Sequence, residues 1–341
     1  MRKKVIIIAE AGVNHNGDLE TAKRLIDVAT DAKVDYVKFQ TFKADTTVSL
    51  KAKKANYQSN NYSDTDQFQY NMLKKLELSH NDHLILMNYA KKRNINFFST
   101  AFDVDGLKYL DSLGFPFFKI PSGELTNYPY LRTAALLGKP IILSTGMANL
   151  EEIEKSINVL ISNGTKKNLI TVLHCNTEYP TPMKDVNLKA MLTIKEKLGV
   201  SIGYSDHTLG IEVPIAAVAM GAQVIEKHFT LDRNMKGPDH KASLEPHELK
   251  DMVKAIRNIE KAISGNGIKE ASSSEKKNIN IARKSIHLSI DLKSGSVITE
   301  KDIIPLRPGD GICAMNWEKV IGKKVNTDLE KFSKLTWENI S

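Results

Sequence analysis

Cysteine is scarce in this chain, and long hydrophobic runs are missing. Only Cys175 and Cys313 occur among 341 residues, which excludes the disulfide framework that holds many small secreted domains. No stretch approaches the roughly 20 apolar residues that a membrane span requires. The apolar run at residues 5–9 is too short for a signal peptide and is interrupted by Glu10. We therefore expect a cytoplasmic protein with no membrane partner.

Nucleotide-binding loops are also lacking. The sequence contains neither Gly-x-x-x-x-Gly-Lys-Ser/Thr nor the Rossmann glycine fingerprint. Lys and Arg number 48 against 40 Asp and Glu, and the net charge of +8 favours anionic partners without choosing among them. Because the lysines are scattered over predicted helices, as at Lys74-Lys75 and Lys91-Lys92, we expect no nucleic-acid partner. A carbohydrate- or nucleic-acid-binding protein is the non-enzymatic alternative.

Short β-branched or aromatic runs alternate with longer helical patterns over most of the chain. Eight such runs in fewer than 250 residues predict parallel βα units and an α/β fold, a closed (β/α)8 TIM barrel. We expect the barrel at 1–265, a Ser- and Gly-rich linker at 266–284, and a small β-rich module at 285–341. The expected strands are 5–12, 35–42, 95–102, 115–123, 140–147, 170–176, 201–208 and 223–229.

Helix boundaries are marked by caps. Asp18, Ser79 with Asp82, and Asn149 with Glu152 are predicted N-caps, and Pro246 and Gly265 are predicted to open and close the last barrel helix. The polar segment 43–71 is predicted to be irregular. It is either a functional loop or a disordered insertion.

Polar side chains follow every one of the eight predicted strands. In a TIM barrel the carboxyl ends of the strands meet at one mouth, where catalysis takes place. Because buried polar groups are costly unless paired, eight such ends indicate a polar ligand. The strand ends carry Glu10, Lys38 and Gln40, Thr100, Lys119 and Ser122, Ser144, His174 to Thr177, Ser205 and His207, and Glu226 and His228.

Two histidines end neighbouring strands, and two lysines end otherwise apolar ones. His207 and His228 are candidate ligands of a divalent metal that would keep open coordination positions. Lys38 and Lys119 would clamp a phosphate or carboxylate, or one of them would form a Schiff base. Glu10 is a candidate base, with an ion pair to a barrel lysine as the alternative.

The ordered motifs resemble those of bacterial sialic acid (nonulosonic acid) synthases. The resemblance rests on Glu10-Ala-Gly-Val-Asn-His, Lys119-Ile-Pro-Ser-Gly-Glu124, His174-Cys-Asn-Thr-Glu-Tyr179, Gly203-Tyr-Ser-Asp-His207 and Glu226-Lys-His228. The C-terminal module, with Arg307-Pro-Gly-Asp-Gly, resembles the antifreeze-like (SAF, β-clip) domain of that family. The match extends over nearly the whole chain.

This resemblance implies a transferase that joins phosphoenolpyruvate to an N-acylated amino-mannose and releases phosphate. N-acetylmannosamine, giving N-acetylneuraminate, is slightly favoured. The alternative is 2,4-diacetamido-2,4,6-trideoxymannose, giving N,N'-diacetyllegionaminate. A Schiff-base aldolase or lyase is the less favoured enzymatic alternative.

The resemblance also assigns residue roles. It implies a catalytic Glu10, a metal site at His207 and His228, most often for Mn2+ with Mg2+ or Co2+ as alternatives, and a domain-swapped homodimer. Phosphoenolpyruvate contacts would be Lys38, Thr100, Lys119, Ser122, Ser144, Thr177 and Ser205; sugar contacts would be Gln40, Glu124, Tyr179, Asp239 and, donated by the other chain, Arg307.

Overall fold

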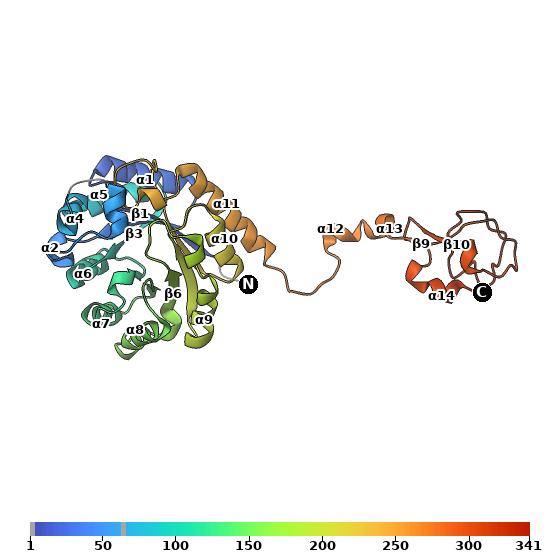
Figure 1. The fold of residues 1–341 in the computed structure, drawn as a ribbon. Coiled ribbons are helices and arrows are strands. Elements are labelled where there is room, and N and C mark those ends of the chain that lie inside the picture. The colour runs from blue at the N-terminus through green and yellow to red at the C-terminus, as the bar shows by residue number, and fades with distance from the viewer. Residues whose placement is uncertain (1–3, 63–65) are drawn as a thin grey trace. The chain divides into compact units, whose positions relative to one another are not determined.

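The computed structural model describes residues 4–62 and 66–341, and it divides into two compact units, Met1–Ser264 and Gly265–Ser341. In Figure 1 the first unit is a ring of helices around a set of strands. The second unit is smaller and poor in regular structure.

The first unit contains the eight predicted strands, each within two or three residues of its expected bounds. All ladders between them are parallel, and the strands are ordered β3-β2-β1-β8-β7-β6-β5-β4. The terminal strands β3 and β4 lie beside each other, so the sheet wraps into a nearly closed barrel and the predicted fold is confirmed. The strands are β1 (Ile6–Gly12), β2 (Tyr36–Thr41), β3 (Asn96–Ala101), β4 (Phe118–Ile120), β5 (Ile141–Ser144), β6 (Ile170–Cys175), β7 (Ser201–Asp206) and β8 (Val224–His228).

Helices cover the outside of the barrel because each carries an apolar stripe. In α1 the stripe is Ala22, Leu25, Ile26 and Ala29, all fully buried against the sheet. The predicted N-caps at Asp18, Ser79 and Asn149 are all present. The barrel helices are α1 (Leu19–Asp31), α5 (His80–Lys92), α6 (Val104–Ser112), α7 (Tyr128–Leu136), α8 (Leu150–Ser162), α9 (Lys189–Leu198), α10 (Glu212–Ala219) and α11 (Pro246–Ala262).

Two expectations about local structure were wrong. The described part of segment 43–71 is not wholly irregular, because it contains α2 (Ala44–Thr47), α3 (Asn56–Tyr62) and the start of α4 (Gln69–Leu76). The helix α11 ends at Ala262, with Ile263 as its C-cap, so Gly265 does not close it. The first error arose because α2 and α3 are too short for an apolar period to be visible.

The second unit holds an antiparallel pair, β9 (Ser285–Leu288) and β10 (Ile303–Leu306), and further isolated bridges. Its own apolar core includes Ile286, Leu288, Ile298 and Leu335. The predicted linker contains α12 (Ser273–Lys276) and α13 (Ile279–Ala282), and α14 (Trp317–Val320) follows β10. Short 3-10 helices are η1 (Ser122–Glu124), η2 (Lys167–Leu169), η3 (Met183–Asp185), η4 (His240–Ala242), η5 (Glu300–Asp302) and η6 (Ala314–Asn316).

Alternation along the strands separates two sets of polar groups. Lys227 on β8 lies between Glu226 and His228 in sequence, and its Nζ forms a fully buried ion pair with Asp206 Oδ2 at 2.6 Å. The same Nζ donates to the carbonyl oxygen of Thr208. Because successive side chains of a strand point to opposite faces, this pair belongs to the outer layer while its neighbours point inward. No helix among the described residues is long and apolar enough to cross a membrane.

The variant Lys227→Met tests this outer pair. It leaves the Asp206 carboxylate buried without its ammonium partner, so the barrel should lose about 3–5 kcal/mol of unfolding free energy. Far-UV circular dichroism in urea measures this loss, while Trp317 and Trp337, both in the second unit, report on that unit separately. The exposed-site control Lys254→Met should change stability by less than about 0.5 kcal/mol. A loss below about 1 kcal/mol in Lys227→Met would contradict the assignment.

Candidate active site

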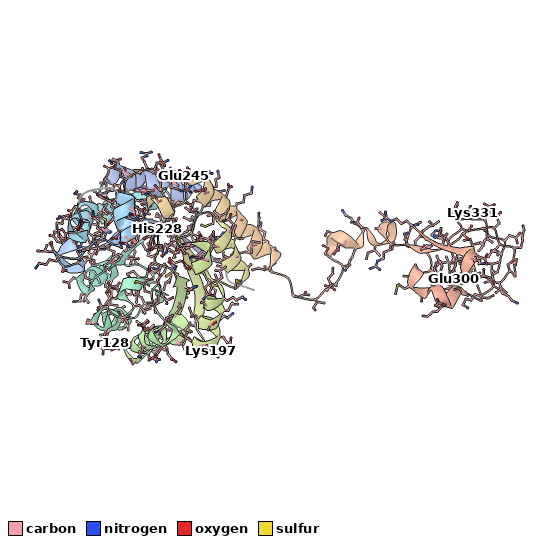
Figure 2. The ribbon with its side chains drawn as sticks, in the orientation of Figure 1. Tyr128, Lys197, His228, Glu245, Glu300 and Lys331 are labelled. Carbon is pink, nitrogen blue, oxygen red and sulfur yellow. The ribbon has the colours of Figure 1, made fainter. Side chains whose placement is uncertain are left out.

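A cavity of about 620 Å³ lies at the carboxyl ends of the barrel strands. His228, labelled in Figure 2, is one of its lining residues and belongs to the barrel unit. The residues predicted for the barrel site all line this cavity: Glu10, Lys38, Gln40, Thr100, Lys119, Ser122, Glu124, Ser144, Thr177, Tyr179, Ser205, His207, His228 and Asp239. Arg307 belongs to the second unit, where it is exposed and its Nε donates to the carbonyl oxygen of Ala282 at 3.0 Å.

The floor of the cavity is a network of two lysines and two carboxylates. Glu226 lies between the lysines, with Oε2 at 3.4 Å from Lys38 Nζ and Oε1 at 3.3 Å from Lys119 Nζ. Ser205 Oγ donates to Glu226 Oε1 at 3.0 Å. Glu10 Oε2 lies 3.0 Å from Lys38 Nζ, so the ion pair considered as the alternative role of Glu10 exists. All four charged side chains are at most 5% exposed.

The local backbone holds Glu10 in this network. Strand β1 changes register between Glu10 and Gly12, and Gly12 has a φ of +54°, in the left-handed region that favours glycine. A Cβ at Gly12 would lie 3.2 Å from Glu10 Oε1 and 3.3 Å from Gln40 Nε2. Gln40 Nε2 donates to Glu10 Oε1 at 3.0 Å. Glycine therefore leaves room for the amide that orients the carboxylate.

Burial and charge separate the pKa values of the two carboxyl groups. Burial raises the pKa of Glu10 to about 7; the Lys38 ammonium opposes this shift and Glu226 adds to it. Burial would also raise the pKa of Glu226, but the ammonium groups of Lys119 and Lys38 outweigh it and lower the value to about 2. Glu226 is thus a permanent anion, whereas Glu10 exchanges its proton near neutrality, as a general base must.

The pKa values of the two lysines also shift in opposite directions. Burial lowers the pKa of Lys119, and Glu226 offsets this only in part. Burial acts on Lys38 as well, but Glu10 and Glu226 outweigh it, and the pKa of Lys38 is raised. Lys38 therefore stays charged, and Lys119 is the less neutralised cation of the two. An anionic ligand that approaches Lys119 restores charge balance there.

Hydroxyl groups surround these cations. Lys38 Nζ donates to Thr100 Oγ1 at 3.2 Å. Ser122 Oγ accepts from the Gly146 amide at 2.9 Å and lies 3.3 Å from Cys175 Sγ. Ser144 Oγ is buried and has no hydrogen-bond partner within the described part of the chain. A buried hydroxyl without a partner is costly, which indicates a ligand that is polar at this position.

The two imidazoles predicted to bind metal lie together. The ring centroids of His207 and His228 are 5.3 Å apart, and the Tyr179 ring packs against both, at 4.1 and 5.6 Å. Burial lowers the pKa of His207 to about 4 and that of His228 well below its ordinary value. Both rings are therefore neutral, the form that binds a metal ion.

Their hydrogen bonds suit metal binding. His207 Nδ1 donates to the Asn176 carbonyl oxygen, which leaves Nε2 as the ring atom with a free lone pair. His228 Nδ1 is buried without a hydrogen-bond partner in the described residues and lies 4.0 Å from Asp239 Oδ2. No group of three or more His, Cys, Asp or Glu among residues 4–62 and 66–341 is arranged to hold a metal. The imidazole pair thus fits an ion that takes its other ligands from water and substrate.

Two of the predicted sugar contacts have further partners. Asn127 Nδ2 donates to Glu124 Oε2, and Tyr179 stacks on Tyr57 with ring centroids 4.8 Å apart. Burial, and then repulsion from Glu10, raises the pKa of Asp239 to about 7. His174 Nε2 forms a hydrogen bond with the Val186 carbonyl oxygen at 3.0 Å.

Glu226 and Tyr57 are cavity residues to which the sequence assigned no role. Glu226 was expected at the end of its strand on the same face as His228, but its function as the shared partner of two lysines was not predicted. Tyr57 lies in the polar segment 43–71, where no periodic pattern marked it. Cys175 is buried and also lines the cavity.

The chain is similar to known proteins over nearly its whole length. A model described as the NeuB family matches residues 25–269, and a SAF domain model matches residues 283–341. The chain is 57% identical to N,N'-diacetyllegionaminic acid synthase of Campylobacter jejuni, over 94% of this chain and 96% of the relative. It is 46% identical to the protein of the same name from Legionella pneumophila, over 98% and 94%. The solved structure of N-acetylneuraminic acid (sialic acid) synthetase from Leptospira borgpetersenii, in complex with citrate, matches with a TM-score of 0.71 and 38% identity, over 81% of this chain and 90% of that one.

The variant Glu226→Gln tests the role of the shared carboxylate. It keeps the side-chain shape but removes the counter-charge of two buried ammonium groups, which should cost about 3 kcal/mol of stability. Inorganic phosphate should then raise the melting temperature of the variant more than that of the unmodified protein, because the anion supplies the missing charge. Thermal unfolding with and without phosphate measures both effects.

The matched control is Glu178→Gln, which removes an exposed carboxylate at the same cavity. It should change neither the stability of the protein nor the rise in melting temperature caused by phosphate. Equal phosphate shifts in Glu226→Gln and the unmodified protein would show that the lysines are not the anion site.

Proposed function

Because this chain belongs to the NeuB family, we propose that it joins phosphoenolpyruvate to 2,4-diacetamido-2,4,6-trideoxymannose and releases N,N'-diacetyllegionaminate and phosphate. The chain is a nonulosonic acid synthase, and the resemblance inferred from its motifs is confirmed. The observation that carries the choice of sugar is 57% identity, over nearly the full length of both chains, to a synthase named for that product.

The sequence slightly favoured N-acetylmannosamine as the sugar, and the comparisons favour the alternative. Two relatives at 57% and 46% identity are named N,N'-diacetyllegionaminic acid synthase. The solved structure named for N-acetylneuraminic acid is less similar, at 38% identity. Both sugars share the acetamido group at C2 and the aldehyde at C1 of the open chain, so the same cavity floor serves either reaction.

Phosphoenolpyruvate is the donor in this proposal. It carries a carboxylate and a phosphate, and the cavity holds two buried ammonium groups that would bind them. Lys119, the less neutralised of the two, and the unpartnered hydroxyl of Ser144 support an anion at this position. The other proposed contacts are Lys38, Thr100, Ser122, Thr177 and Ser205, all of which line the cavity.

The sugar would lie above the donor, toward Gln40, Glu124, Tyr179 and Asp239. A second chain would lend Arg307 in a domain-swapped homodimer. This part of the proposal comes from the family resemblance. Fixing two substrates in contact converts a bimolecular step into an intramolecular one, which is a large part of the catalysis we propose.

His207 and His228 would hold a divalent metal, Mn2+ in this proposal. The ion would supply Lewis acidity that polarises the aldehyde oxygen of the open-chain sugar. The neutral state of both rings and the carbonyl bonded to His207 Nδ1 support this role.

Glu10 is the proposed base. The methylene carbon of phosphoenolpyruvate attacks the aldehyde carbon, and positive charge develops at the carbon that bears the phosphate. A water molecule adds there as Glu10 takes its proton, and the C–O bond to phosphate then breaks to leave a 2-keto acid. The pKa of Glu10, raised to about 7 by burial, suits this proton transfer near neutral pH.

A phosphate-release assay with both sugars tests the reaction. In the presence of Mn2+ we expect kcat/KM to be at least about tenfold higher for 2,4-diacetamido-2,4,6-trideoxymannose than for N-acetylmannosamine. A reaction without sugar is the control and should release no phosphate. Faster turnover of N-acetylmannosamine would reverse the assignment. Pyruvate trapped on Lys38 or Lys119 by borohydride would instead support the Schiff-base lyase.

Metal removal tests the histidine pair. Treatment with EDTA should abolish phosphate release, and added Mn2+ should restore it. In His207→Gln and His228→Gln, Mn2+ binding measured by calorimetry should be weakened at least about tenfold. His247→Gln, at an exposed position outside the cavity, is the control and should bind Mn2+ normally. Full activity of the EDTA-treated enzyme without added metal would exclude the metal role.

A further inference from the structure

One wall of the active-site cavity is apolar. Beyond the carboxyl ends of β2 and β3, Val48, Leu73 and Phe102 line the cavity and are partly exposed in it. Leu73 and Phe102 pack against a small hydrophobic cluster, separate from the barrel core, formed by Val13, Phe42, Met72 and Leu76, which also line the cavity. We call Val48, Leu73 and Phe102 the apolar wall.

Helices of segment 43–71 and its continuation build this wall. Val48 directly follows α2, and Leu73 belongs to α4, which packs against α2. Phe102 directly follows β3 and meets Phe42 edge to face, with ring centroids 5.9 Å apart. Glu77, just after α4, accepts from the Ala44 amide at 2.7 Å at the start of α2. The wall is therefore fixed by both packing and hydrogen bonding before any substrate binds.

Three polar side chains of the same segment that line the cavity are already engaged in hydrogen bonds. Thr47 Oγ1 donates to the Lys43 carbonyl oxygen at 2.8 Å. Gln69 Nε2 donates to Gln58 Oε1 at 3.4 Å, and the same Gln58 oxygen accepts from the Ala55 amide at 3.0 Å. This side of the cavity therefore has apolar surface to offer a ligand, whereas the floor offers charges and hydroxyl groups.

The two candidate sugars differ at two positions. The proposed substrate has a methyl group at C6 and an acetamido group at C4, where N-acetylmannosamine has hydroxyl groups. At C6 a hydroxymethyl group is replaced by a methyl group, and at C4 a hydroxyl is replaced by an amide that carries a methyl group. A methyl group gains by contact with apolar surface, and a hydroxyl placed there loses water without gaining a partner.

We propose that Val48, Leu73 and Phe102 contact the C6 methyl and C4 acetamido methyl groups of the sugar, and so determine specificity for a 6-deoxy diacetamido substrate. The inference rests on the proposed function, because it names the residues that select the sugar of that reaction. An apolar pocket discriminates by about 10–200-fold for one methylene-sized difference. Contacts at two methyl groups thus account for the preference expected from the relatives.

Two variants test the wall. Val48→Thr replaces one methyl by a hydroxyl at nearly constant shape, and Leu73→Gln places an amide on the wall while keeping a good helix former in α4. The control is Leu136→Gln, the same substitution at a 63% exposed position on α7. Melting temperatures confirm that each variant is folded.

The assay compares the proposed substrate with its analogue that carries a hydroxyl at C6, both with saturating phosphoenolpyruvate. In Val48→Thr or Leu73→Gln, kcat/KM for the 6-deoxy sugar should fall about tenfold. The preference over the 6-hydroxy analogue should shrink by a similar factor. The KM for phosphoenolpyruvate, set by the cavity floor, should stay within about twofold, and Leu136→Gln should match the unmodified enzyme.

Failure of this inference differs from failure of the proposed function. If the unmodified enzyme prefers N-acetylmannosamine, the proposed function is wrong. If it prefers the diacetamido sugar but both folded wall variants keep that preference, the wall assignment is overturned. A rise in the KM for phosphoenolpyruvate equal to the loss for the sugar would also overturn it, because general damage to the cavity would then explain the effect.

Discussion

The placement of two buried lysines on one carboxylate is the constraint on which the site depends. Glu226 lies within 3.4 Å of Lys38 Nζ and Lys119 Nζ, at the centre of the barrel. Two ammonium groups without this counter-charge would be too costly to bury. Because the carboxylate is shared, neither lysine is fully neutralised by it. Because Glu10 adds a second carboxylate beside Lys38 but not beside Lys119, the same arrangement that lets the barrel fold leaves positive charge at Lys119 for an anionic donor.

Barrel geometry separates stability from catalysis along a single strand. On β8, Glu226 and His228 point into the cavity, while Lys227 between them pairs with Asp206 in the outer layer. A shift of β8 by one residue would exchange these roles, so both ion-pair systems oppose such a shift. The outer pair holds the strands, and the inner groups remain free to meet a ligand.

The cavity combines a charged floor with an apolar side. The floor comes from strand ends, where Glu10 and Glu226 have opposite pKa shifts because they differ in the number of lysines nearby. The side comes from α2, α4 and the residue after β3, which lie beyond the strands. Floor residues suit the chemistry common to the family, and the side is where members that use different sugars can differ without disturbing that chemistry.

The sequence by itself determined the eight strands and the caps at Asp18, Ser79 and Asn149, because strand alternation and capping are local and periodic signals. The polar strand ends came from the same pattern, whereas Glu124, Tyr179 and Asp239 were assigned as site residues by the resemblance to the family, and all three line the cavity. Only the tertiary structure decided which cation meets which carboxylate, since Glu10, Lys38, Lys119 and Glu226 come from four strands and one anion serves two lysines. It also decided that segment 43–71 contains α2, α3 and the start of α4 and contributes Val48 and Tyr57 to the cavity, because helices this short are stabilised by packing rather than by their own sequence.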